Sequence, residues 1–163
     1  GDAIYLPKIG TSDWVDYICG RFEATGKQIS RELAEKICQI VDNHSSYVQQ
    51  LSWLLWIRTI NTATTEQLSY ALEDLLDQNN ILFQSETENL SAYQMNFLKA
   101  IVDGIHTKFS SKEVISKYNL GTSANIVRLK NALLQKELIE TNGKEIVLAD
   151  PVFGVWFKKE MPY

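Results

Sequence analysis

Six polar side chains near the C-terminal end of the sequence are of the types that contact nucleic acids. Four could reach base edges: Ser123, Asn125, Arg128 and Asn131. Two more, Lys130 and Lys144, could reach phosphates. Arginine and asparagine suit base recognition because each can form two parallel hydrogen bonds, to guanine and to adenine respectively. The residue types therefore indicate a surface that could contact DNA.

The charge of the chain argues against DNA as the main partner. The 163 residues carry a net charge of −4, and the pI is near 5.2. Residues 1–90 contain 6 Lys/Arg and 13 Asp/Glu, whereas residues 91–163 contain 10 and 7, a balance of only +3. A protein whose affinity comes from phosphate neutralisation presents a concentrated basic stripe. We therefore favour a structural role or protein contact over DNA binding for these side chains.

Catalytic and cofactor-binding motifs are missing from the sequence. The run at 25–27, TGK, ends like a phosphate-binding loop, but GxxxxGK[ST] requires glycine where Arg21 stands and Ser or Thr where Gln28 stands. The two histidines and two cysteines show no zinc-ligand spacing. No nucleophile, base and orienting group can be nominated together. We expect no catalysis, metal or cofactor in this chain by itself.

The C-terminal half is predicted to contain three helices with clear start signals. Ser91 with Gln94, and Ser110 with Glu113, have the spacing of a capping box at a helix N-terminus. Thr122 caps a longer third helix. The inward face of that helix is expected to carry Ile126, Leu129 and Leu133.

Turn signals complete this C-terminal unit. Gly121 can adopt the backbone conformation of a tight turn between the second and third helices. Asn142-Gly143, between two extended runs, predicts a β-hairpin. Asp150-Pro151 predicts the start of a last helix. Residues 91–163 are therefore expected to form a winged helix-turn-helix domain.

The N-terminal half is predicted to be a four-helix bundle over residues 1–88. The expected helix starts are Ser12, Ser30, His44 and Thr64. Gly26 provides a C-terminal stop, and Gln67 completes a capping box with Thr64. The polar stretch 84–91, QSETENLS, is taken as the boundary between the two units. The fold class expected for the chain is thus mainly α, with one small hairpin.

Two features of the third predicted helix have alternative interpretations. His44 at its start could contact a nucleotide or phosphate, because helix N-termini favour anions, or it could bond locally to the helix end. The latter is favoured from sequence alone. The aromatic-rich run 53–56, WLLW, is interpreted as core and subdomain contact rather than as a ligand platform.

The sequence lacks signals for membranes and for secretion. No apolar run approaches the roughly 18 residues of a membrane-spanning helix, and no signal-peptide pattern is present. Cys19 and Cys38 fall in apolar helical segments and are expected to be buried thiols rather than a disulfide. We expect a cytoplasmic protein without a membrane partner.

Four runs, taken in order, resemble a known family. They are FEATGKQIS at 22–30, NHSSYVQQL at 43–51, the pattern GxxxxxSxxEV from Gly104 to Val114, and LADPVFGVWF at 148–157. This order resembles the C-terminal portion of archaeal-type AAA ATPases, which also occur in bacteria. In that family a P-loop domain is followed by a helical lid and a winged helix. The resemblance covers nearly all of residues 3–160, and DPVFGVWF is its most telling motif.

The resemblance implies functional assignments. Residues 3–88 would be the lid, and the family's GGHPxY segment matches residues 42–47, which places His44 and Tyr47 at the edge of an ATP site. Asp42-Asn43 replaces the glycine pair and Ser45 the proline, which would weaken nucleotide contact. ATP and Mg²⁺ are implied for a full-length protein. The implied partners are an N-terminal P-loop domain of the same chain and a protein, with DNA as a further candidate.

Three hypotheses follow. The leading one is a lid and winged helix that couple the nucleotide state of a P-loop ATPase to a partner, with an exposed apolar patch on residues 1–60. The alternative is a free-standing winged-helix transcriptional regulator that binds DNA. The third is a protein-binding adaptor. Neither the partner nor the oligomeric state is specified by the sequence.

Overall fold

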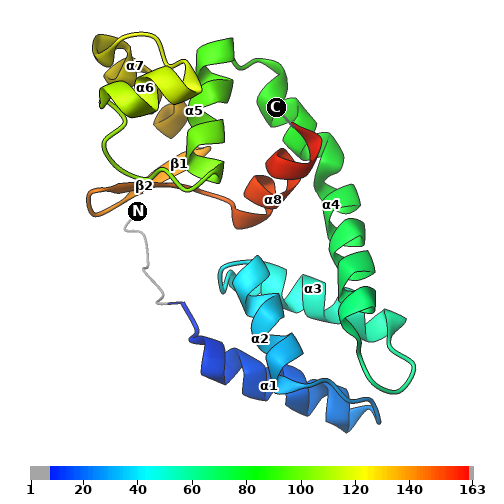
Figure 1. Cartoon of the computed structure of the whole chain (residues 1–163). Coiled ribbons are helices and arrows are strands. Elements are labelled where there is room, and N and C mark those ends of the chain that lie inside the picture. Colours follow the sequence, from blue (N-terminus) through cyan, green and yellow to red (C-terminus); the bar gives the residue numbers. More distant parts are fainter. Residues whose placement is uncertain (1–7, 162–163) are drawn as a thin grey trace, which may run out of the picture. The chain divides into compact units, whose positions relative to one another are not determined.

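The computed structural model describes residues 8–161 as a mainly helical chain with one small hairpin (Figure 1). It divides into two compact units, residues 1–79 and 80–163. The first contains α1 (Thr11–Ala24), α2 (Arg31–Ile40), α3 (Ser45–Arg58) and the first part of α4 (Thr65–Glu88). The second contains the end of α4, α5 (Ala92–Val102), α6 (Lys112–Tyr118), α7 (Ser123–Gln135), β1 (Ile139–Asn142), β2 (Glu145–Leu148) and α8 (Pro151–Glu160). The mainly α fold class predicted from the sequence is confirmed.

Local capping signals position most helices of the first unit as predicted. Ser30 accepts a hydrogen bond from the Leu33 backbone N–H at 3.1 Å and so caps α2. Thr64 and Gln67 form the reciprocal capping box of α4, with distances of 3.0 and 3.2 Å. Gly26 has φ of +79°, a left-handed conformation that ends the first helix segment. The core consists of apolar side chains from all four helices, including Ile18, Phe22, Ile37, Leu51, Leu55 and Leu75.

The start of the first helix differs from the prediction. Ser12 was expected to be the N-cap, but α1 begins at Thr11 and its N-cap is Gly10, whose carbonyl accepts from Trp14 N–H at 3.1 Å. The Thr11 side chain hydrogen-bonds instead to Asn43, in the turn before α3. The contact between Thr11 and Asn43 thus accompanies a start of α1 that lies before Ser12, the predicted cap.

Apolar side chains lie on all sides of α3. Val48, Leu51, Leu54 and Leu55 are buried, whereas Trp53 and Ile57 are exposed. At its end, Arg58 makes two hydrogen bonds to Asp74 of α4, at 2.8 and 3.0 Å. A helix that is apolar all round is usually covered all round, yet α3 is covered on one side only by the described residues.

The second unit has the predicted helix-turn-helix. Ser91 and Gln94 form both bonds of the capping box at α5. The second cap lies one residue later than predicted: Ser111, not Ser110, accepts from Val114 N–H, because a turn at Lys108 with φ of +57° shifts the helix start. Gly121, with φ of +88°, lies in the turn before α7. Thr122 is the N-cap of α7, although its side chain makes no capping bond.

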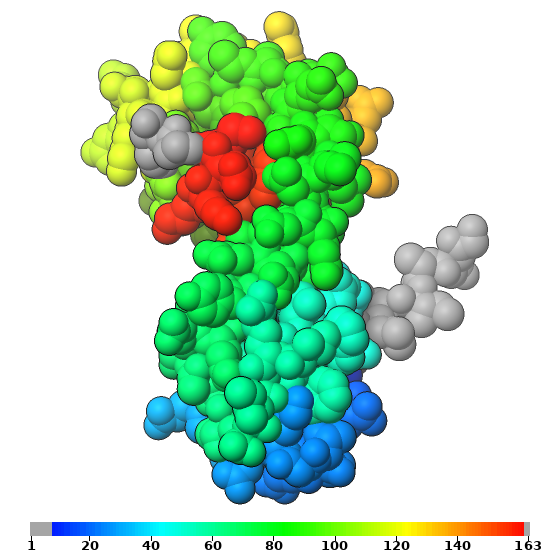
Figure 2. Space-filling view, turned by 90° about the vertical axis from the view of Figure 1, so that its right-hand side faces the viewer, coloured from blue at the N-terminus to red at the C-terminus, as the bar shows by residue number. Residues whose placement is uncertain are grey.

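The hairpin and last helix complete the winged helix. β1 pairs antiparallel with β2 in a register that places Asn142 opposite Glu145, so Gly143 and Lys144 form a two-residue loop. The Asp150 carboxylate accepts from the backbone N–H groups of Val152 and Phe153 at 2.9 and 3.2 Å and caps α8. In Figure 2 the red atoms of α8 lie against green atoms of α4 and α5.

The two units meet within α4 rather than at the predicted polar stretch 84–91. Residues 84–88 continue α4, and the division falls between Asn79 and Asn80. The cause is Phe83, which is fully buried and contacts Phe153 and Trp156 of α8, with ring centroids 5.4 and 5.6 Å apart. The end of α4 therefore belongs to the core of the winged helix, despite its polar sequence.

Candidate functional site

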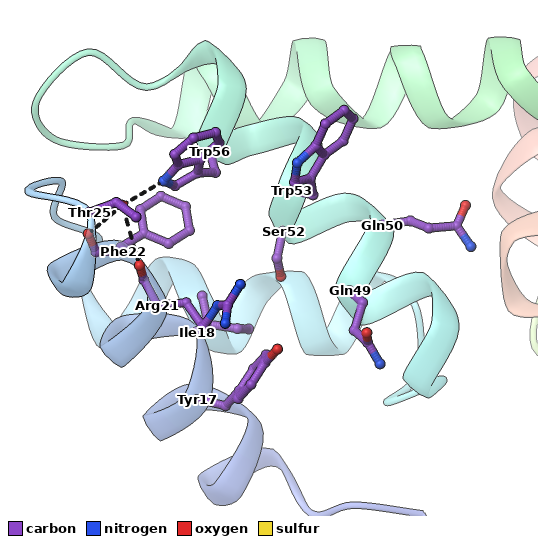
Figure 3. A pocket seen from close by; sticks show the side chains of 10 residues that line it. All are labelled: Tyr17, Ile18, Arg21, Phe22, Thr25, Gln49, Gln50, Ser52, Trp53 and Trp56. Atoms are coloured by element: carbon purple, nitrogen blue, oxygen red, sulfur yellow. Dashed lines mark hydrogen bonds between the residues drawn. The ribbon is translucent and has the colours of Figure 1, made fainter.

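A cleft of about 530 Å³ lies between α1 and α3 (Figure 3). Tyr17 and Arg21 contribute to it from α1, and Ser52 and Trp53 from α3, with Trp56 at one end. The remaining lining residues are Ile18, Phe22, Thr25, Gln49 and Gln50. Its volume lies within the range of ligand-binding and side-chain-binding pockets in proteins.

One wall of the cleft is held rigidly. The Trp56 indole N–H donates to Thr25 Oγ1 at 2.8 Å, a bond drawn in Figure 3. Lys27 Nζ donates to the Trp56 carbonyl at 2.8 Å and lies 3.9 Å from the centroid of its ring. Residues 25–27 therefore act on Trp56 rather than on a phosphate. The loop after α1 fixes the end of α3.

Two other side chains that line the cleft are exposed. The side chain of Trp53 is 58% exposed and that of Tyr17 is 47% exposed. Of the core and subdomain contact predicted for the run 53–56, the core part is wrong for Trp53, because the buried face of α3 is already filled by its leucines. Contact of Trp53 with another subdomain stays a prediction. Beyond the cleft, Ile57 and Ile60 are 49% and 82% exposed. This group of exposed apolar side chains matches the patch expected on residues 1–60.

The cleft has one charged lining residue. The Arg21 guanidinium lies 5.9 Å from the Tyr17 ring centroid and forms no ion pair with any residue from 8 to 161. The Ser52 hydroxyl is buried and has no hydrogen-bond partner within the same range. The cleft thus offers aromatic surface and one positive charge, whereas its Ser52 hydroxyl oxygen is buried.

His44 and Tyr47 lie together at the start of α3. His44 is the N-cap but makes no capping bond with its side chain. Its ring lies 4.7 Å from that of Tyr47, between centroids, and its Nδ1 is buried without a hydrogen-bond partner in the described residues. The two residues form a unit distinct from the α1–α3 cleft, whose lining includes neither.

The six candidate nucleic-acid contacts differ in accessibility. The exposed ones are Ser123, Arg128 and Asn131 on α7, and Lys144 in the hairpin loop. Asn125 is half-buried and donates from Nδ2 to the Leu120 carbonyl at 3.1 Å. Lys130 is also half-buried. The structure therefore leaves Ser123, Arg128, Asn131 and Lys144 accessible for an external contact.

A shallow hollow of about 260 Å³ adjoins the start of α7. It is lined by Tyr93, Gly121, Thr122, Ala124, Asn125 and Arg128. Tyr93 comes from α5 and was not predicted at this position. No group of three or more His, Cys, Asp or Glu side chains that could hold a metal ion occurs in residues 8–161. Across the same residues, no helix is both long and apolar enough to cross a membrane.

The cleft was not predicted either. Tyr17 and Arg21 lie four residues apart, which places them on one face of α1, but many exposed helix faces show such a pair. The informative signal was the run 53–56, because apolar residues in succession cannot all face one side of a helix. At least one of these four side chains had to lie outside the core.

Comparisons with known proteins agree with the fold. Residues 81–159 match the family model of a probable winged helix domain, so this part of the chain forms a winged helix domain. The chain as a whole is similar in fold to a Walker-type ATPase of Pyrococcus abyssi, with a TM-score of 0.68 and 17% sequence identity. The similarity covers 93% of this chain but 42% of that ATPase chain. No match was found among the curated proteins.

Proposed function

We propose that this chain is the lid and winged-helix region of a P-loop ATPase. The observation that carries the proposal is the fold match to a Walker-type ATPase, which extends over 93% of the chain and so includes both compact units. A winged helix alone serves many functions. A match that includes a helical unit followed by a winged helix favours an ATPase over the other classes of protein that contain a winged helix.

The exposed apolar face of the first unit supports the same proposal. Trp53, Ile57 and Ile60 expose large apolar side chains on or just after α3. Contiguous apolar patches on soluble proteins mark interaction sites more often than chance. In the proposed function, the P-loop domain of the longer protein covers this face.

The chain would not be catalytic by itself. The motifs that bind phosphate and Mg²⁺ would lie in the P-loop domain, and ATP and Mg²⁺ are expected only there. His44 and Tyr47 are proposed to approach the nucleotide from the lid, because His44 lies at the N-terminus of a 14-residue helix. Closure of the lid would then change the contacts of the winged helix with a protein partner.

Hydrogen exchange tests this function in the gene product that includes the upstream region. We expect the amides at the start of α3 to exchange more slowly with a non-hydrolysable ATP analogue than with ADP, since the lid closes over ATP. The His44→Ala variant should reduce that difference, whereas Lys36→Ala, at an exposed position of α2, should not. Equal rates of amide hydrogen exchange in residues 8–79 with the ATP analogue and with ADP would contradict the proposal.

DNA binding is a second candidate function, favoured by the exposure of Arg128, Asn131 and Lys144. If α7 lies in a major groove, binding should weaken with salt, and Arg128→Ala should cost about 1–3 kcal/mol of binding free energy. Lys36→Ala, on α2, is the matched control. Fluorescence anisotropy with a labelled duplex measures the affinity. If substitution of Arg128 and Lys144 leaves the affinity for the duplex unchanged, binding through α7 and the hairpin is excluded.

A further inference from the structure

We infer that the α1–α3 cleft receives a polypeptide segment of the P-loop domain that presents a carboxylate next to a large apolar side chain. The inference rests on the proposed function and specifies the chemistry by which the two parts recognise each other. The cleft comprises Tyr17, Arg21, Ser52, Trp53 and Trp56 and their lining neighbours.

The apolar part of the occupant follows from α3. This helix is covered on one side by the core of the first unit, and its outer side presents Trp53, with Ile57 one turn further. Trp56 is fixed in place by Thr25 and Lys27, so the wall needs no ordering when a partner binds. Aromatic walls of this kind take up large apolar side chains, and aromatic residues are enriched among those that contribute most to binding at interface centres.

The carboxylate follows from charge complementarity. Arg21 is the charged residue of the cleft, and no acidic side chain in residues 8–161 neutralises it by an ion pair. Residues 1–90 contain 13 Asp/Glu and 6 Lys/Arg, so Arg21 is one of few positive groups in a unit that is negative overall. A carboxylate on the occupant would form a charge-assisted hydrogen bond with Arg21.

A nucleotide fits the cleft less well than a polypeptide. Phosphate groups need several positive or N–H donors, and Arg21 is a single cation. Lys27 is occupied by the Trp56 carbonyl and ring. The exposed apolar surface also continues beyond the cleft to Ile57 and Ile60, which a compact ligand would leave uncovered.

The length of the related ATPase indicates where the segment comes from. This chain matches 42% of that ATPase, so more than half of the related protein lies outside the matched part. A domain joined to the same chain binds at a high effective concentration, which allows a small, partly polar contact to be occupied.

Fluorescence quenching by acrylamide tests the inference. Trp14 and Trp156 are buried and Trp56 is half-buried, so Trp53 dominates the quenching of the 163-residue chain. The signal of Trp53 is isolated as the difference between wild type and Trp53→Phe. In the gene product with its upstream region, we expect this difference to disappear because the cleft is filled. Arg21→Glu should restore it, and Lys36→Glu, a charge reversal on α2, should not.

Other results would overturn the inference in distinguishable ways. If a P-loop domain is present but acrylamide still quenches Trp53, the proposed function stands and the inference that a segment of that domain fills the cleft is wrong. An upstream region without a P-loop would contradict both the proposed function and this inference. Shielding of Trp53 in the 163-residue chain by ATP alone would make the cleft a nucleotide site. Shielding that grows with the concentration of that chain would make a second copy the occupant.

Discussion

The Trp156 indole N–H donates a hydrogen bond to Asn80 Oδ1 at 2.8 Å, which joins α8 to α4. The Trp156 side chain is fully buried, so this bond satisfies a polar group that water cannot reach. The same two helices are packed together by Phe83 and Phe153, whose rings meet edge to face. The last motif of the sequence, DPVFGVWF, is therefore a packing motif that closes the winged helix onto the end of α4.

Removal of the Asn80 side chain should destabilise the second unit. Asn80→Ala leaves the indole N–H of Trp156 without its acceptor, which is expected to cost about 1–3 kcal/mol of unfolding free energy. Urea unfolding measures the change. Asn89→Ala, at an exposed position just after α4, should stay within about 0.5 kcal/mol. Equal stabilities of the two variants would contradict the importance of this bond.

The position of the division between units predicts which fragment folds. A fragment of residues 80–163 should unfold cooperatively, because it retains Phe83. A fragment of residues 91–163 should lose about 3–5 kcal/mol, the usual cost of removing a buried phenylalanine side chain. Circular dichroism during thermal unfolding compares the two. If both fragments melt at the same temperature, Phe83 is not part of the winged-helix core.

The lysine on Trp56 should stabilise the first unit. Lys27→Met removes the ammonium that lies 3.9 Å from the ring centroid and bonds to the carbonyl, with an expected loss of about 1–2 kcal/mol. Lys36→Met, on α2, is the matched control. Chemical denaturation followed by tryptophan fluorescence is the measurement. If Lys27→Met lowers the free energy of unfolding no more than the control does, the apolar part of the Lys27 side chain, and not its ammonium group, stabilises the unit.

The stability of the second unit should depend on the ionisation of Glu86. Burial, and secondarily the charge of Asp150, raise the pKa of Glu86 above its ordinary value of 4.5. The folded state therefore holds this proton more tightly than the unfolded state. As pH rises from 4.5 through the raised pKa, stability contributed by the neutral acid is lost. The side chain of the Glu86→Gln variant stays neutral at every pH. Between pH 4 and 7, its free energy of unfolding in urea should therefore fall less than that of the wild type. Parallel pH profiles of the free energy of unfolding for the two proteins would contradict this.

The elements with local signals could be predicted from the sequence. Capping pairs such as Ser91 with Gln94, and the hairpin turn at 142–143, depend on neighbours within a few residues. Both are present in the structure. The order of these elements was enough to indicate a winged helix, which the family match over 81–159 supports.

The candidate site depended on contacts that have no local signal. Thr11 prefers Asn43, 32 positions away, so α1 starts before the expected cap. Phe83 belongs to the winged helix because of Phe153, 70 positions further along the chain. The α1–α3 cleft likewise requires two helices to be placed side by side before Arg21 and Trp53 can share a surface. Periodicity within one helix does not specify its partner.

The central claim is that this chain is the lid and winged helix of a P-loop ATPase, and reading the native gene upstream of residue 1 tests it most directly. We predict an in-frame strand, the motif GxxxxGK[ST] and a following helix, as a phosphate-binding loop requires. A start codon directly before residue 2, with no such motif upstream, would contradict the claim and make DNA binding through α7 the next hypothesis to test.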